Sequence, residues 1–491
     1  MPGPNRFRLT EVRAYGVAAG LLATVGAGLV SYMAEPAQAQ IAVRNQGFVP
    51  YSEAPINYRT QEPNDPVALL QKEIDQGKAR LVYDEKDHGY LKSVLKLLKV
   101  PVSSQTLVFS KTSFQYAKIS AEHPRALFYN DDVYVGSVHD GKTIEIVSFD
   151  PMQGAMFYLV DEQKVDKPAF QRAELDCTQC HIAAGTRGIP GVFLRSVYPQ
   201  PAGTLTPRAP MFITDQKSPL KERWGGWYVT GALGQGSLAN AAVANYVPIS
   251  AAEAAAHPPG PPEVTPLPAT YDPKAYLVPG SDQVALLVLA HQTQMHNLIT
   301  LTNYQTRLAL YALAKTSDAP AAQAAPALDA LPEATRTQIT RPAEQLIRYL
   351  LFAGEAPLGG ADAKQVIATS AFAREFAAKG VRDSKKRSLR DFDLHDRIFR
   401  YPCSYLIYSE AFDAIPEPAK GYIYHRLLQV LSGEDQSPDF AGLTAPDRKA
   451  ILDILIETKP GLPAEWQAYG RTNHLRQVAL SPARATPIRD E

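Results

Sequence analysis

A short motif in the first half of the chain carries residues that can do chemistry: Cys177-Thr178-Gln179-Cys180-His181. Two thiols separated by two residues can add to the two vinyl groups on one edge of a porphyrin. The adjoining histidine can then coordinate the iron through its imidazole. A C-x-x-C pair also occurs in half of a zinc site and in thioredoxin-like redox proteins. The only other cysteine, Cys403, is far away in the sequence, and no βαβ pattern surrounds the motif, so haem attachment is the favoured interpretation.

The five residues of this motif resemble the attachment site of c-type cytochromes. The resemblance implies one covalent haem c, with Cys177 and Cys180 as thioether anchors and His181 as the proximal iron ligand. Residues 128–136 and 223–231 also look like segments of large cytochromes that are predicted to be periplasmic. The resemblance therefore implies an exported monohaem cytochrome that transfers single electrons. Dihaem peroxidases and dihaem rubber oxygenases need two attachment motifs, and this chain has one.

The sixth position of the iron separates electron transfer from catalysis or gas binding, because a Met or His ligand gives a relay and an open position binds a small molecule. Three residues on a mostly apolar predicted helix are candidates: His291 as the first choice, with Met295 and His296 as alternatives. Met211 is a further candidate, and the position can also lack a protein ligand. The spacing of the motif does not decide among these alternatives.

Haem propionates need donors, and a guanidinium matches a carboxylate in bidentate fashion. Four arginines follow the motif within fifty residues and are candidates for this role: Arg187, Arg195, Arg208 and Arg223. Trp224 and Trp227 could flank the haem, although ordinary core packing explains either residue as well. Cys403 is expected to be a buried, unreactive thiol.

The N-terminal residues predict export. Arg6, Arg8 and Arg13 form a basic segment, residues 14–34 carry no charge, and Ala37-Gln38-Ala39 fits a cleavage site. Residues 1–39 are thus a cleaved signal peptide or an uncleaved membrane anchor. Both place the remainder on the periplasmic side, because the positive flank stays inside.

Composition excludes some classes of partner. The 491 residues contain 50 Lys+Arg and 50 Asp+Glu, so no global charge favours nucleic acid. A redox partner protein or a small-molecule substrate is expected instead. A hydrophobic content of 45% is that of a globular protein with real cores.

Hydrophobic periodicity predicts an α+β fold. Helices are expected at 66–74, with Asp65 as N-cap, and at 90–98, ended by Pro101. Alternating segments separated by turn residues then predict an antiparallel meander that forms one wall of the haem pocket. These segments are 105–110, 126–129, 133–138, 143–149 and 155–160. Helical periods dominate the C-terminal region at 281–315, 343–352, 370–379, 405–412, 420–431 and 445–458.

These observations divide the chain into four parts. Residues 1–39 are the export segment, 40–256 the haem-binding region with the meander and the motif, 257–280 a Pro-rich linker, and 281–491 a mostly helical region. The leading function is electron transfer through covalent haem. The alternative is a periplasmic haem enzyme, peroxidase-like or oxidase-like, or a gas-binding module with an open sixth position. The length of the chain favours something more than a shuttle, and whether the protein is an enzyme stays open.

Overall fold

The computed structural model describes residues 49–86, 88–243, 262–316 and 327–471. All of these residues belong to one compact unit.

The predicted export segment therefore lies outside the described residues, as do residues 257–261 of the predicted linker. None of the helices in the described part is both long enough and apolar enough to span a membrane.

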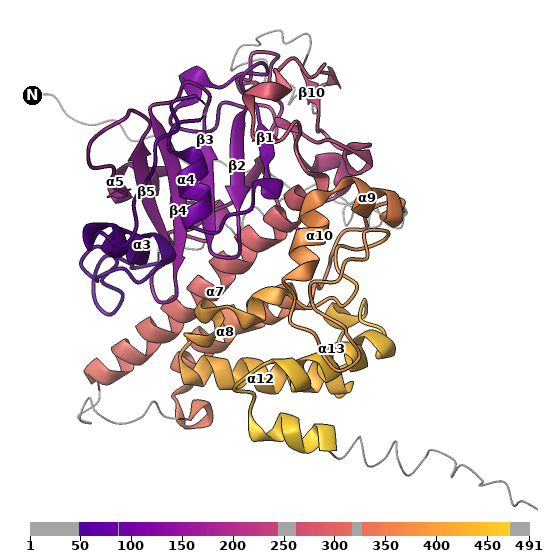
Figure 1. The fold of residues 1–491 in the computed structure, drawn as a ribbon. Helices are drawn as coiled ribbons and strands as arrows, with labels where there is room; N and C mark the ends of the chain where they lie inside the picture. The colour runs from indigo at the N-terminus through magenta and orange to yellow at the C-terminus, as the bar shows by residue number, and fades with distance from the viewer. Residues whose placement is uncertain (1–48, 87, 244–261, 317–326, 472–491) are drawn as a thin grey trace, which may run out of the picture. The chain divides into compact units, whose positions relative to one another are not determined.

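The fold is α+β, with a seven-stranded antiparallel sheet in the N-terminal half and a mostly helical C-terminal region (Figure 1). The predicted meander is confirmed, because β2 to β5 pair consecutively. The strand order is β6-β5-β4-β3-β2-β1-β9. The strands are β1 (Thr106–Val108), β2 (Arg125–Tyr129), β3 (Val133–Ser137), β4 (Thr143–Asp150), β5 (Gly154–Asp161), β6 (Gln171–Arg172) and β9 (Trp227–Tyr228). Two smaller pairs are β7 (Leu194–Ser196) with β8 (Phe212–Thr214), and β10 (Ala241–Ala242) with β11 (Thr265–Pro266).

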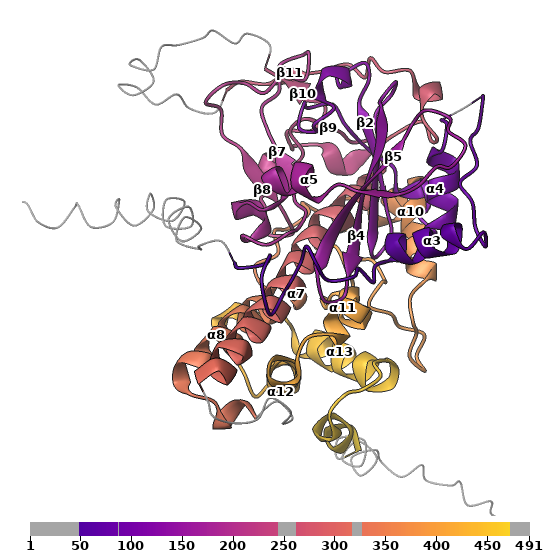
Figure 2. The ribbon, with the colours of Figure 1, turned by 90° about the vertical axis from the view of Figure 1, so that its left-hand side faces the viewer.

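Both faces of the large sheet are covered. Successive side chains of a strand point to opposite faces, so Val135 and Ile146 pack with α3 (Pro66–Asp75) and α4 (Leu91–Leu97) on one side. Tyr134 and Phe157 belong to the core on the other side, where the long helix α7 lies. Figure 2 shows α3 and α4 on one side of the strands and α7 on the other. As predicted, Asp65 caps α3, accepting hydrogen bonds from the first-turn backbone N–H groups.

Helix α7 (Gln283–Thr316) joins the sheet to the helical region. Its N-terminal two thirds are buried on all sides, which is typical of a central helix. Asp282 caps it by accepting from Val284 N and Ala285 N at 2.9 and 3.0 Å. One hydrophobic core extends from the sheet through α7 to the last helices, so the regions predicted at 40–256 and 281–491 share a core.

The C-terminal helices differ from prediction in three places, one of which is a helix at 363–369 that was not predicted. Helix α8 (Glu333–Leu350) begins ten residues before the predicted position and contains Pro342. The helix predicted at 405–412 is a 3-10 turn, Tyr405–Tyr408, followed by the short α11 (Glu410–Asp413), because the Ser409 hydroxyl accepts from Phe412 N and starts a new helix. The other helices are α5 (Glu174–His181), α9 (Ala363–Thr369), α10 (Ala371–Ala378), α12 (Glu417–Ser432) and α13 (Ala445–Thr458).

Candidate functional site

A cavity of about 370 Å³ lies against the face of the sheet that looks toward α7. This volume falls within the usual range for small-molecule and cofactor sites. Its walls are the sheet, helix α5, the loop that precedes β2 and the segment 192–195, and Leu289 and Thr293 contribute from α7. The predicted meander therefore does form one wall of the cavity that contains the motif.

All three chemical groups of the motif line this cavity. Cys177, Cys180 and His181 occupy positions i, i+3 and i+4 of α5, so they share one face of the helix. Cys180 is exposed, whereas Cys177 and His181 are half-buried. The imidazole of His181 rests against Phe157 of β5, with 5.0 Å between the ring centroids.

The orientation of the His181 ring is set by the chain. Its Nδ1 donates to the carbonyl oxygen of Gly191 at 2.8 Å, which leaves Nε2 as the nitrogen that can coordinate a metal. Histidine ligands of metals usually donate their other N–H in this manner. Burial lowers the pKa of His181, so the imidazole is neutral at neutral pH, as a ligand must be.

Helix α7 holds the loop that carries Gly191. Asn297 accepts from Val192 N at 3.2 Å and donates to Val192 O at 2.7 Å, and Gln294 donates to Gly185 O at 2.9 Å. A Cβ at position 191 would overlap the Asn297 side chain, so only glycine lets the loop approach α7 this closely. Sequence reasoning missed Asn297, although polar residues on an otherwise apolar helix were a signal.

The floor of the cavity contains a charged pair. Arg125 of β2 forms an ion pair with Glu145 of β4 across the intervening β3. Gly136 of β3 lies directly opposite Glu145, and a Cβ there would overlap the Arg125 guanidinium. Glycine at this position thus provides the space in which the arginine reaches its partner.

Glu145 also anchors the loop before β2. Its Oε1 accepts from Ser113 Oγ at 2.7 Å and from Gln115 Nε2 at 2.9 Å. Burial, followed by the charge of Glu145, raises the pKa of the Cys177 thiol to about 12.

One of the four arginines predicted to bind propionates lies in the cavity lining, namely Arg195 on β7. Arg223 is buried and donates to Ser218 O and Gln216 O at 2.7 and 3.0 Å, and neither Arg187 nor Arg208 is part of the lining. Trp227 lines the cavity and donates to Arg195 O at 2.8 Å. Trp224 is fully buried elsewhere in the core.

The first-choice distal ligand, His291, is not brought to the cavity. It is fully buried, with Nδ1 at 2.5 Å from Gln216 Oε1 and Nε2 at 2.8 Å from Ser404 Oγ. Its ring stacks on Phe352 with 4.6 Å between centroids. Burial lowers its pKa to about 3. To coordinate iron, His291 would have to leave all of these partners.

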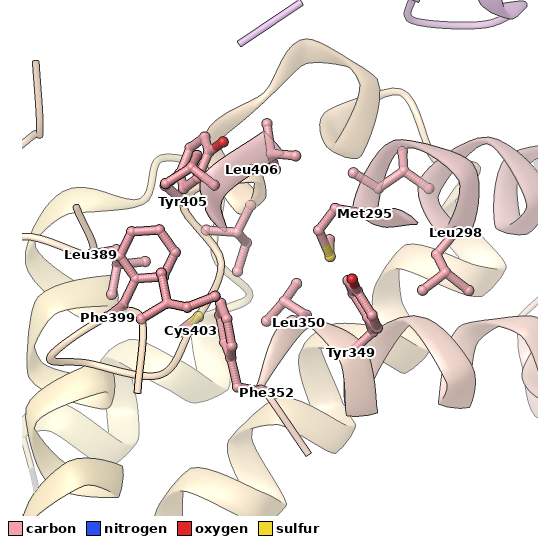
Figure 3. Close-up of a cluster of buried hydrophobic side chains, with 14 of the residues drawn as sticks. Met295, Leu298, Tyr349, Leu350, Phe352, Leu389, Phe399, Cys403, Tyr405 and Leu406 are labelled. Carbon is pink, nitrogen blue, oxygen red and sulfur yellow. The ribbon is translucent and has the colours of Figure 1, made fainter. Parts of the chain in front are cut away.

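The alternative ligands are also held elsewhere. His296 lies 2.8 Å from Asp131 O through Nε2 and stacks on Phe149 at 3.9 Å between centroids. Met295 is fully buried in the core with Leu298 and Tyr349 around it (Figure 3). Met211 is exposed. Within the described part of the chain, His181 is the one histidine in the cavity lining, and no methionine occurs there.

A bare metal ion and a haem make different demands on the side chains of this cavity. The described residues include no group of three or more His, Cys, Asp or Glu side chains that could hold a metal ion by themselves. A haem makes a smaller demand, because the porphyrin supplies the equatorial nitrogens and the protein supplies axial ligands and anchors. Two free thiols and a correctly oriented imidazole on one cavity wall, with Arg195 beside them, fit a covalent haem.

Compared with protein-family models, with curated proteins and with solved structures, the chain has no match.

Replacing Asn297 should loosen the loop that orients His181. We expect Asn297→Ala to lower the free energy of unfolding by about 2–4 kcal/mol, because two buried backbone groups lose their partner. Hydrogen–deuterium exchange of residues 183–192 should rise. The control is Asn303→Ala, which removes a bond from the same helix to Ala414 O at 3.0 Å. Equal exchange of the loop in both variants would contradict this role for Asn297.

The thiols of the haem-free protein should differ in reactivity. At pH 8 we expect iodoacetamide to modify the exposed Cys180 first and Cys177 much more slowly, because a pKa of about 12 leaves little thiolate. Cys403, which is fully buried, should react only after unfolding. Peptide mass spectrometry against time measures the order, and faster modification of Cys177 than of Cys180 would contradict it.

Proposed function

We propose that this protein is an exported monohaem c-type cytochrome that transfers single electrons through covalently bound haem. Cys177 and Cys180 would hold the haem as thioethers, and His181 would be its proximal ligand. A bound haem supplies a one-electron couple at its iron. The chain supplies attachment, orientation and an apolar surround.

One observation carries this proposal: the three motif residues face a single cavity while His181 already donates its Nδ1 hydrogen to Gly191. That arrangement supports a c-type haem over the two alternatives considered for a C-x-x-C pair. A zinc site would need further ligands near the two thiols. A thioredoxin-like pair would not need a neighbouring histidine whose Nδ1 is held by a backbone carbonyl.

Export and partners belong to the same proposal. The basic and apolar N-terminus supports a periplasmic protein, either released or tethered to the membrane by residues 1–39. The balanced charge supports a redox partner protein or a small-molecule substrate over nucleic acid.

A second candidate function is a haem enzyme or gas-binding protein with an open sixth position. The placement of His291, Met295 and His296 favours it, because each has partners in the core. Among the residues that the structure describes, the sheet wall of the cavity offers no such ligand: its side chains are mainly apolar, with the Arg125–Glu145 ion pair among them.

Covalent attachment should depend on two of the three cysteines. In a host with a working haem-maturation pathway, the mature protein should carry the mass of one haem and keep haem staining after denaturing electrophoresis. The double variant Cys177→Ala, Cys180→Ala should lose both signals. Cys403→Ala is the matched control, because this thiol is buried in the helical core (Figure 3), and it should keep them. A mature protein without the haem mass would refute the proposal.

The distal candidates should be dispensable for haem ligation. We expect Met295→Leu, His291→Gln and His296→Gln to leave the optical spectra of the ferric and ferrous protein unchanged. Met295→Leu, which nearly conserves volume, should lower the free energy of unfolding by less than about 1.5 kcal/mol. A change from low-spin to high-spin in any one variant would identify that residue as the distal ligand.

A further inference from the structure

We propose that the sixth position of the haem iron takes a small anion from solution and that Arg125 is the residue that stabilises it. This inference rests on the proposed function. It names the class of ligand that would bind if the sixth position of the haem iron is open. Fluoride, azide, hydroxide and nitrite are anions of this class.

The His181 imidazole and the Arg125 guanidinium lie over the same face of the sheet, above different strands. His181 contacts Phe157 on β5, and the Arg125 guanidinium lies over Gly136 on β3. Strand β4 lies between β5 and β3, and Gly136 is offset by two residues along the strands from Phe157, so the two positions are roughly 12 Å apart at about 4.8 Å per strand and about 3.4 Å per residue. Both residues line the same cavity. If His181 holds the haem, a small ligand bound in this cavity would have Arg125 in the wall around it.

Arg125 is fixed in place and still has a donor to offer. Its ion pair with Glu145 holds one end of the guanidinium, and Ser113 and Gln115 hold Glu145 in turn. Its Nε is buried and has no hydrogen-bond partner among the described residues. A buried, unsatisfied N–H of a charged group is costly. An anion in the cavity could accept a hydrogen bond from this N–H. Because the ion pair already holds the arginine side chain in place, binding would cost little additional conformational entropy.

The charge of the cavity also favours an anion. Its lining contains the cations Lys111, Arg125 and Arg195 against the acids Glu145 and Asp176. A neutral gas would gain little from these charges, whereas an anion bound near Arg125 gains a charge-assisted hydrogen bond.

The test uses the mature, haem-loaded protein. Ferric protein is titrated with sodium fluoride and with sodium azide, and ferrous protein with carbon monoxide, each followed by optical spectroscopy. We expect all three to bind. Arg125→Leu should weaken fluoride and azide by about tenfold to a hundredfold, the size of a hydrogen bond to a charged group. Carbon monoxide should bind both proteins equally, and Arg125→Lys should restore part of the anion affinity.

Two further variants separate this role from a structural one. Gly136→Ala should weaken both anions without removing any charge, because a Cβ there displaces the guanidinium. Arg397→Leu removes an arginine of comparable burial that pairs with Asp447 outside the cavity, and it should bind both anions as the parent does. If Arg125→Leu does not fold, Gly136→Ala and Arg125→Lys carry the test.

The outcomes are distinguishable. A loaded protein that is low-spin in both oxidation states and binds none of the three ligands would overturn the open sixth position while leaving the haem proposal intact. Lys111 coordinating the iron would produce that result. Anion affinities unchanged in Arg125→Leu and Gly136→Ala would overturn the role of Arg125. A mature protein that lacks covalent haem would instead refute the proposed function.

Discussion

Asn297 bonds to both backbone groups of Val192, and this contact is the constraint on which the candidate site depends. It fixes the loop after the motif against α7. The loop in turn presents the carbonyl of Gly191 to His181. The buried part of a central helix thereby sets the orientation of a histidine more than one hundred residues earlier in the chain. Because an unsatisfied buried amide is costly, this arrangement has few alternatives.

The other buried polar residues of α7 follow the same logic. Gln292 donates to Asn130 O at 2.8 Å, and His291 connects Gln216 to Ser404. Gln292 and His296 both fasten the turn between β2 and β3, and His291 fastens two other loops. Two histidines and a methionine within six residues looked like iron ligands. In the structure His291 bonds Gln216 and Ser404, and His296 bonds the β2–β3 turn. Met295 fills the core near Leu298 and Tyr349 (Figure 3).

The sheet contributes the second half of the site through its register. Alternation sends Tyr134 and Gly136 toward α7 while Val133 and Val135 face α3 and α4. Gly136 is the one position in its strand where an arginine from the neighbouring strand can lie flat over the backbone. A cavity with an apolar wall, a half-buried imidazole and a fixed guanidinium follows from that register.

Much of this protein can be determined from its sequence alone. The α+β class, the meander and the long helix follow from local periodicity, because strands and helices have different repeats. The motif predicts its chemistry because its two thiols and its imidazole stand at a spacing that is local in sequence. The pattern that predicts export, at residues 1–39, is also local in sequence and lies outside the described residues.

Only the tertiary structure decided which distant residues meet. Arg125 lies more than fifty residues before His181 and shares its cavity, whereas His291 was favoured on its helix and is bonded elsewhere. No periodicity reports which side of a fully buried helix faces which neighbour, since all its sides are apolar or paired. Strand pairing and hydrogen bonds to buried amides join residues that are far apart in the sequence. These interactions place Asn297, Gly136 and Arg125 around the motif.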